Sequence, residues 1–243
     1  MARIITFGEI MMRLNPESYL RFVQADKFEA TYAGGEANVA VSLANFGLDS
    51  AYVTKLPKHA IGQAAIDSLR YFGVDTSKVV RGGDRVGIYY LEKGASQRGS
   101  VCIYDRAHSA IAEAKADDFD WDAIFEGADW FHFTGITPAL GGELVAICEA
   151  ACKAAKAHGV KISCDLNYRN KLWSREKACE VMSQLVPYVD VLIANVISWV
   201  LAVATAYGTN RYKHTITVME ATKATERIMC GAKAFTNPLV RDY

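Results

Sequence analysis

Two adjacent glycines and an asparagine three residues later have types and spacing that could bind a ligand. Gly34 and Gly35 stand before a helical pattern, and Asn38 follows them. Glycine allows a ligand to approach the backbone closely, and the N–H groups at a helix start have no partner within the helix. Asn38 offers a hydroxyl group both a donor and an acceptor. Taken alone, however, this pattern more often forms only a tight turn between a strand and a helix.

Other residues with chemical potential favour structural roles. His132 stands in an apolar run, so we expect a core histidine and not a catalytic base. Cys148 and Cys152 lie one helical turn apart, but no histidine accompanies them, so we expect buried thiols there and no zinc or redox site. No spacing in the chain is typical of a metal site, and the sequence predicts no metal ligands.

Alternating strands and helices must position these residues. Strands are expected at 3–8, 51–56, 130–135, 160–165 and 189–194, and helices at 39–47, 61–72, 140–158 and 176–185. Such alternation predicts an α/β fold with a parallel sheet flanked by helices. Residues 86–92 and 100–104 interrupt it as two strand candidates, which glycines connect, so we expect a hairpin. Beyond residue 195 the alternation stops, and 214–218 is the one strand-like run.

Length and composition limit the function classes. The 243 residues suit one large α/β domain over 1–243, with 196–243 as an atypical tail. Lys and Arg together number 27, as do Asp and Glu, so the charge indicates neither nucleic-acid nor membrane partners. The N-terminal residues lack a signal-peptide pattern, and the apolar run 196–206 is too short to span a bilayer. We therefore expect a cytoplasmic protein with reduced cysteines.

Two segments taken together resemble the opening signature of the ribokinase-like (PfkB) carbohydrate kinases. They are Phe-Gly-Glu-Ile-Met-Met-Arg-Leu at 7–14 and Ala-Gly-Gly-Glu-Ala-Asn-Val-Ala at 33–40. Tyr89, Tyr104-x-Arg106 and the run Asp-Leu-Asn-Tyr-Arg-x-x-Leu-Trp at 165–173 are similar to the members that phosphorylate 2-keto-3-deoxygluconate. The resemblance covers about residues 1–195. It implies a small β lid on the sheet, with lid strands within about 10–33 and 84–106.

The resemblance also implies a binding site for a sugar acid. Gly34, Gly35 and Asn38 would bind sugar hydroxyls, and Tyr89 and Tyr104 would cover the sugar from the lid. Arg106 and Arg169 would address the carboxylate and keto end, because a guanidinium matches carboxylate geometry with two hydrogen bonds. The family further implies ATP and magnesium as cofactors, with Asn195 on the cofactor side, and a homodimer formed through the lid.

The C-terminal part departs from the family pattern. The family carries Asn-x-x-Glu after the strand at 189–194, whereas this chain has Asn195-Val-Ile-Ser198. Its signature Asp-Thr-x-Gly-Ala-Gly-Asp supplies an anion hole and a general base, and the tail offers only Gly231-Ala232-Lys233. We therefore name no catalytic residue and expect C-terminal units that are truncated or diverged. The resemblance therefore implies one of three functions: a kinase of 2-keto-3-deoxygluconate or a related sugar acid, a non-catalytic sugar-acid-binding remnant, or a truncated fragment.

Overall fold

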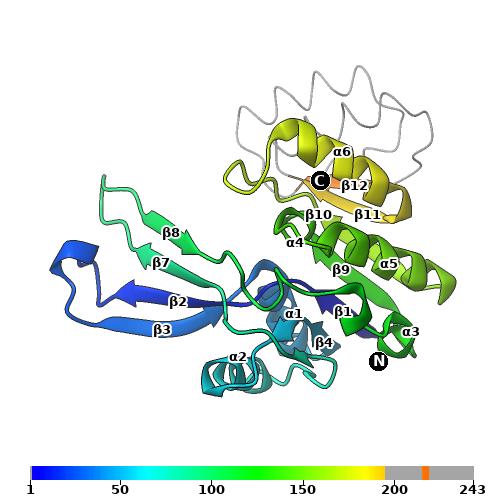
Figure 1. Cartoon of the computed structure of the whole chain (residues 1–243), viewed down its shortest axis with the longest axis horizontal. Coiled ribbons are helices and arrows are strands. Elements are labelled where there is room, and N and C mark those ends of the chain that lie inside the picture. The colour runs from blue at the N-terminus through cyan, green and yellow to red at the C-terminus, as the bar shows by residue number, and fades with distance from the viewer. Residues whose placement is uncertain (1, 195–214, 219–243) are drawn as a thin grey trace.

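A computed structural model of the chain describes residues 2–194 and 215–218. Within these ranges the central sheet has six strands in the order β12-β11-β10-β9-β1-β4, and every neighbouring pair is parallel (Figure 1). The predicted parallel sheet is confirmed, and its last strand falls on the strand-like run expected at 214–218. The strands are β1 (Arg3–Phe7), β4 (Asp49–Val53), β9 (Trp130–Thr134), β10 (Lys161–Asp165), β11 (Val191–Ala194) and β12 (Thr215–Val218).

Helices cover both faces of this sheet. On one face, Phe7, Phe131 and their neighbours pack in a single hydrophobic cluster with α3 (Trp121–Phe125), α5 (Leu144–Ala157) and α6 (Arg175–Leu185). On the other face, Tyr52 packs with buried residues of α1 (Gly35–Asn45) and α2 (Ala60–Arg70). The remaining elements are α4 (Ile136–Ala139), the short pair β5 (Lys55–Leu56) and β6 (Val80–Arg81), and the 3-10 turns η1 (Phe22–Gln24), η2 (Ala116–Asp118) and η3 (Val186–Tyr188).

Local backbone geometry moves some element boundaries away from the expected ones. The helix expected from residue 140 begins at Leu144, because Gly141 and Gly142 adopt φ of 92° and 59°, which a right-handed helix cannot contain. The last described helix begins behind Ser174, whose Oγ accepts a hydrogen bond of 3.2 Å from the N–H of Lys177. The strand expected at 51–56 is divided into β4 and β5.

The predicted hairpin belongs to a second sheet that projects from the body of the molecule (Figure 1). Its strands are β3 (Phe28–Ala33), β2 (Met11–Pro16), β7 (Ile88–Glu92) and β8 (Val101–Asp105), in that order across the sheet. We call this sheet the lid. The two hairpin strands pair antiparallel, as predicted, and all four strands fall within the ranges expected for a lid.

The register of the lid sorts its side chains onto two faces. Thr31, Arg13, Tyr89 and Tyr104 are aligned across the four strands, so they lie on one face. The neighbouring row contains Ala30, Leu14, Tyr90 and Ile103, which lie on the opposite face.

No helix within the described ranges is long and apolar enough to cross a membrane.

Candidate functional site

The glycine pair stands where the chain leaves the lid and begins α1. A Cβ atom on Gly34 would lie 2.0 Å from the carbonyl oxygen of Glu9, so the backbone leaves room only for glycine. A Cβ atom on Gly35 would meet Thr134 Cγ2 at 3.8 Å and Asn167 Nδ2 at 3.9 Å, which are ordinary contacts. Gly35 therefore lies at the carboxyl ends of β9 and β10, the edge where parallel α/β sheets bind ligands.

A buried carboxyl group holds the start of α1 against β9. Glu36 is 1% exposed, and its Oε1 accepts hydrogen bonds from Thr134 N at 3.2 Å, Thr134 Oγ1 at 2.7 Å and Thr137 Oγ1 at 2.8 Å. Burial raises the pKa of Glu36, and the donors oppose this shift. Gly8 completes the contact, because a Cβ atom there would lie 2.2 Å from Glu36 Cδ. The first turn of α1 is thereby fixed relative to the sheet edge.

The loop after β10 reaches this edge as a tight turn. Asn167 has a φ of 36°, a left-handed conformation, and its N–H donates to Asp165 Oδ1 at 2.9 Å. Two residues later, exposed Arg169 interacts electrostatically with both Asp165 and Tyr104 of the lid. Burial raises the pKa of Asp165, and the charge of Arg169 opposes that rise. The turn thus directs a guanidinium group toward the lid.

The two predicted tyrosines lie side by side on the lid. The ring centroids of Tyr89 and Tyr104 are 5.9 Å apart. Tyr89 pairs with Arg13 in the strand register, and the charge of Arg13 opposes the rise of the Tyr89 pKa; the Nε of Arg13 donates to Thr31 Oγ1 at 2.8 Å. Burial raises the pKa of both tyrosines, so both phenols are protonated near neutral pH. The aligned row therefore offers neutral hydroxyl donors beside a cation.

Cationic side chains surround the ring of Tyr104. Arg106 Cζ lies 5.6 Å and Lys171 Nζ 5.9 Å from its centroid, within the range of cation–π contacts. Arg106 also pairs with buried Glu9. We use the name cationic cluster for the group formed with the two tyrosines by Arg13, Arg106, Arg169 and Lys171. Among these described residues the cations outnumber the adjacent carboxylates, Glu9 and Asp165, which favours an anionic ligand.

The structure separates one predicted residue from this cluster. Asn38 is exposed and lines a cavity of about 350 Å³ between α1 and α2, together with Tyr32 and Phe72. Tyr32 follows Thr31 in β3, so its side chain lies on the opposite face of the lid. Gly34, Gly35, Tyr89, Tyr104, Arg106 and Arg169 do not line this cavity.

Three residues of this site were not singled out from the sequence: two of the cationic cluster, and the carboxylate that pairs with Arg106. Arg13 stands between apolar residues of a strand, and such an isolated charge could have indicated a ligand site. Glu9 directly follows the glycine that ends a strand, where carboxylates often lie at a ligand site. Lys171 gave no signal of its own, because its contact with Tyr104 joins segments that are distant in the chain.

Residues expected to be structural are buried. The Nδ1 of His132 lies 2.9 Å from Ser163 Oγ, and burial lowers the pKa of His132 to about 4, as expected for a neutral core histidine. Cys148 and Cys152 lie in the core beneath the sheet, and burial raises the pKa of Cys152 to about 12. A thiol with that pKa is a poor metal ligand at neutral pH.

The cofactor side of the predicted site has little support in the described residues. Asn195 lies outside them, as does the rest of the atypical tail apart from β12. Within residues 2–194 and 215–218, no group of three or more His, Cys, Asp or Glu side chains could hold a metal ion. The described residues therefore provide no preformed magnesium site of their own.

Sequence comparison identifies relatives with named activities. Residues 1–202 match the model of the pfkB family carbohydrate kinases. A 2-dehydro-3-deoxygalactonokinase of Haloferax volcanii is 40% identical over 195 residues, which are 79% of this chain and 60% of that protein. A 2-dehydro-3-deoxygluconokinase of Bacillus subtilis is 31% identical over 170 residues, which are 70% of this chain and 52% of that protein. The chain thus spans less than two thirds of the length of either relative.

Comparison with solved structures gives the same family as the sequence comparison. The crystal structure of a 2-dehydro-3-deoxygluconokinase from Thermotoga maritima matches with a TM-score of 0.85 and 50% sequence identity. The match covers 90% of this chain and 72% of that one. The parallel sheet flanked by helices is therefore the ribokinase-like fold that the resemblance implied.

Proposed function

The chain belongs to the pfkB family of carbohydrate kinases, and we propose that it binds 2-keto-3-deoxygluconate, or a closely related sugar acid, for ATP-dependent phosphorylation. The compound is also called 2-dehydro-3-deoxygluconate, the name carried by two of the relatives above. The cationic cluster carries this proposal. Four cations gather around two protonated tyrosines, and the carboxylates beside them among the described residues are those of Glu9 and Asp165.

The ligand chemistry assigns a role to each part of the site. Arg106 and Arg169 address the carboxylate and keto end, since guanidinium groups pair with carboxylates through two parallel hydrogen bonds. The hydroxyl groups of Tyr89 and Tyr104 cover the sugar from the lid. Gly34 and Gly35 bring the backbone at the start of α1 close to the sugar hydroxyls.

The phosphate donor and the assembly belong to the same proposal. ATP would supply the phosphoryl group, with Asn195 on the cofactor side. A homodimer forms through the apolar face of the lid, where Phe28, Val101 and Ile103 are 41%, 44% and 51% exposed. Cys102, Cys148, Cys152 and Cys164 are free thiols, which agrees with a reducing cytoplasm.

A specific sequence feature favours a second function, sugar-acid binding without catalysis. Asn195 is followed by Val-Ile-Ser instead of x-x-Glu, and the tail lacks the Gly-Ala-Gly-Asp signature that supplies a general base and an anion hole. Binding requires only the cationic cluster and the start of α1, whereas phosphoryl transfer also requires charge stabilisation at the phosphate.

Coupled ADP release with ATP, magnesium and 2-keto-3-deoxygluconate distinguishes the two functions, alongside calorimetric binding of the sugar without ATP. Arg169→Ala is the test variant, and Arg175→Ala is its matched control, because Arg175 is also exposed and begins α6. Sugar-dependent ADP release that only Arg169→Ala abolishes supports the kinase. Binding that only Arg169→Ala weakens, without ADP release, supports the binding function. Absence of both signals refutes the proposal.

A further inference from the structure

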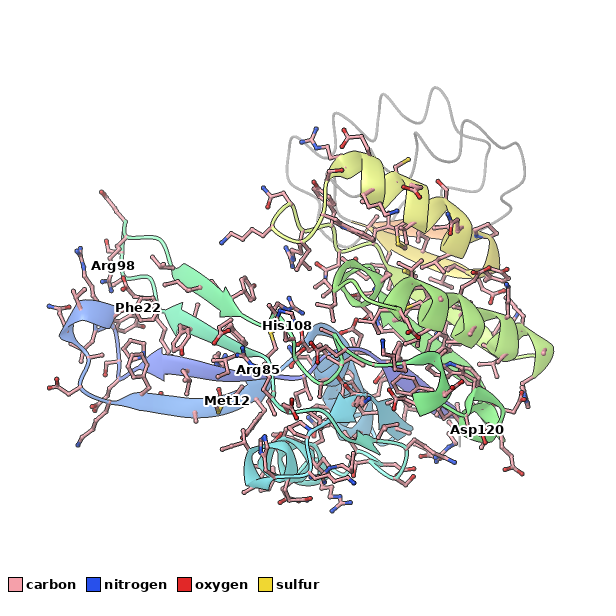
Figure 2. All side chains as sticks on the ribbon, in the orientation of Figure 1. Met12, Phe22, Arg85, Arg98, His108 and Asp120 are labelled. Atoms are coloured by element: carbon pink, nitrogen blue, oxygen red, sulfur yellow. The ribbon has the colours of Figure 1, made fainter. Side chains whose placement is uncertain are left out.

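The chain passes between the body and the lid at four places, which we call the hinge: residues 8–10, 33–34, 86–87 and 106–109. Glu9 contacts the other three passages. A Cβ atom on Gly34 would lie 2.0 Å from the Glu9 carbonyl oxygen, and one on Gly87 would lie 2.5 Å from Glu9 Oε1. Arg85 and His108 mark this junction in Figure 2.

The Glu9 carboxylate is fully engaged within the hinge. It is 2% exposed, and its Oε1 accepts a hydrogen bond of 2.8 Å from Ser109 Oγ. Its Oε2 accepts from Arg106 Nε at 2.8 Å and also from Arg106 Nη2. An ion pair shielded from water in this way is stronger than a surface pair and costs more to break from one side.

This pairing orients the Arg106 guanidinium. Glu9 occupies the Nε and Nη2 edge, and the Tyr104 ring lies 5.6 Å from the guanidinium carbon. In the part of the chain that the structure describes, no hydrogen-bond partner accompanies Arg106 Nη1. One edge of the guanidinium is therefore fixed and the other remains available to a ligand.

We propose that Glu9 is a positioning residue: it holds Arg106 at the hinge with its free edge ready for the carboxylate of the sugar acid. This inference rests on the proposed function. It assigns part of the preference for an acid over a neutral sugar to a residue that does not touch the ligand. It also couples that preference to the hinge, because the carboxylate of Glu9 contacts the passages at 86–87 and 106–109, and its backbone carbonyl oxygen contacts the passage at 33–34.

The lid provides a matched control. Glu92 is also a buried lid carboxylate, 7% exposed, and it accepts from Arg98 Nη1 at 3.3 Å and from Phe22 N at 3.0 Å. Phe22 and Arg98 lie at the far end of the lid from the hinge (Figure 2). Glu92→Gln therefore disturbs a buried Glu–Arg pair without touching Arg106.

The test compares the affinities for two sugars by calorimetry. One is 2-keto-3-deoxygluconate, and the other is 3-deoxyfructose, in which a hydroxymethyl group replaces the carboxylate. We expect Glu9→Gln to raise the Kd of the acid about tenfold and to change that of the neutral sugar by less than about twofold. Glu92→Gln should change neither. In an Arg106→Ala background, Glu9→Gln should cause no further loss of acid preference.

An unchanged ratio of the two affinities in Glu9→Gln would overturn the inference. Tighter binding of the acid would also overturn it, because Glu9 would then only reduce the positive charge near the ligand.

If the unaltered protein binds neither sugar, the proposed function fails, and amide hydrogen exchange then tests whether Glu9 holds the hinge. The N–H of Ser109 donates to Arg106 O, and that of Ala110 to Arg85 O. Both amides should exchange faster in Glu9→Gln but not in Glu92→Gln, and equal rates would overturn the inference.

Discussion

The two adjacent glycines at the start of α1 should respond differently to the same substitution, Gly34 with a loss of stability and Gly35 with a loss of binding. In Gly34→Ala the new methyl group would lie 2.0 Å from the Glu9 carbonyl oxygen and 3.2 Å from Ile10 Cα, both of which are backbone atoms. In Gly35→Ala the nearest atoms are side-chain atoms at 3.8 and 3.9 Å. Both substitutions add the same methyl group, so the difference between their effects on stability measures the close approach of Gly34 to the backbone of Glu9.

The expected magnitudes follow from these contacts. Gly34 has an extended backbone that any residue can adopt, so the cost of Gly34→Ala is steric alone. Forcing the hinge segment at Glu9 away should destabilise the protein by about 2 kcal/mol, which lowers Tm by about 4–8 °C for a chain of this size. Gly35→Ala should leave stability within about 0.5 kcal/mol. Its methyl group lies near Asn167 at the sheet edge, so it should instead weaken binding of the sugar acid.

Thermal unfolding followed by circular dichroism, with urea titration as a second measure, tests the stability difference. Calorimetric titration with 2-keto-3-deoxygluconate tests binding. Equal Tm values for Gly34→Ala and Gly35→Ala would refute the steric reasoning. Loss of binding in Gly35→Ala together with a large fall in Tm would show that Gly35 is structural too.

Three further outcomes are expected. Burial lowers the pKa of His132 from 6.5 to about 4, so the unfolded chain takes up the proton first. Stability should then fall as the pH drops from about 6.5 to 4, by at most about 3 kcal/mol, and His132→Asn should remove this part of the pH dependence in urea titrations. Ile103→Asp on the lid should shift the mass in analytical ultracentrifugation from dimer to monomer, whereas Phe46→Asp at the exposed end of α1 should not; a monomeric unaltered protein would contradict the lid dimer. Lys171→Gln should raise the Kd of the sugar acid about threefold by removing a cation near Tyr104, and an unchanged Kd would exclude Lys171 from the site.

The predicted fold depended on local patterns and is largely confirmed. Apolar runs such as 130–135 and 160–165 are buried strands, and the spacing of apolar residues in 144–157 produces a helix with one face in the core. The hairpin at 86–104 was readable because its two strands are joined by a short, glycine-containing segment. Errors arose at boundaries, where Gly141 and Gly142 delay α5 through their positive φ.

Only some residues of the candidate site could be predicted from the sequence. Gly34 and Gly35 stood out from their types and spacing, and the family resemblance added Tyr89, Tyr104 and Arg169. The resemblance also placed Arg106 near the sugar carboxylate, but it did not indicate that Glu9 occupies one edge of its guanidinium. Asn38, predicted beside the glycines, lines a cavity with Tyr32 instead.

The sequence by itself determined which segments become strands and helices, the family of the chain and the positions of its glycines, because these properties depend on neighbouring residues. Only the tertiary structure decided which side chains meet. Glu9 and Arg106 are 97 positions apart, and Lys171, between β10 and α6, contacts Tyr104 in β8 of the lid. Such contacts depend on the order of the strands, their register and the direction in which the lid leaves the sheet. For the same reason two adjacent glycines have different surroundings: Gly34 faces the backbone of Glu9, and Gly35 faces the edge of the sheet.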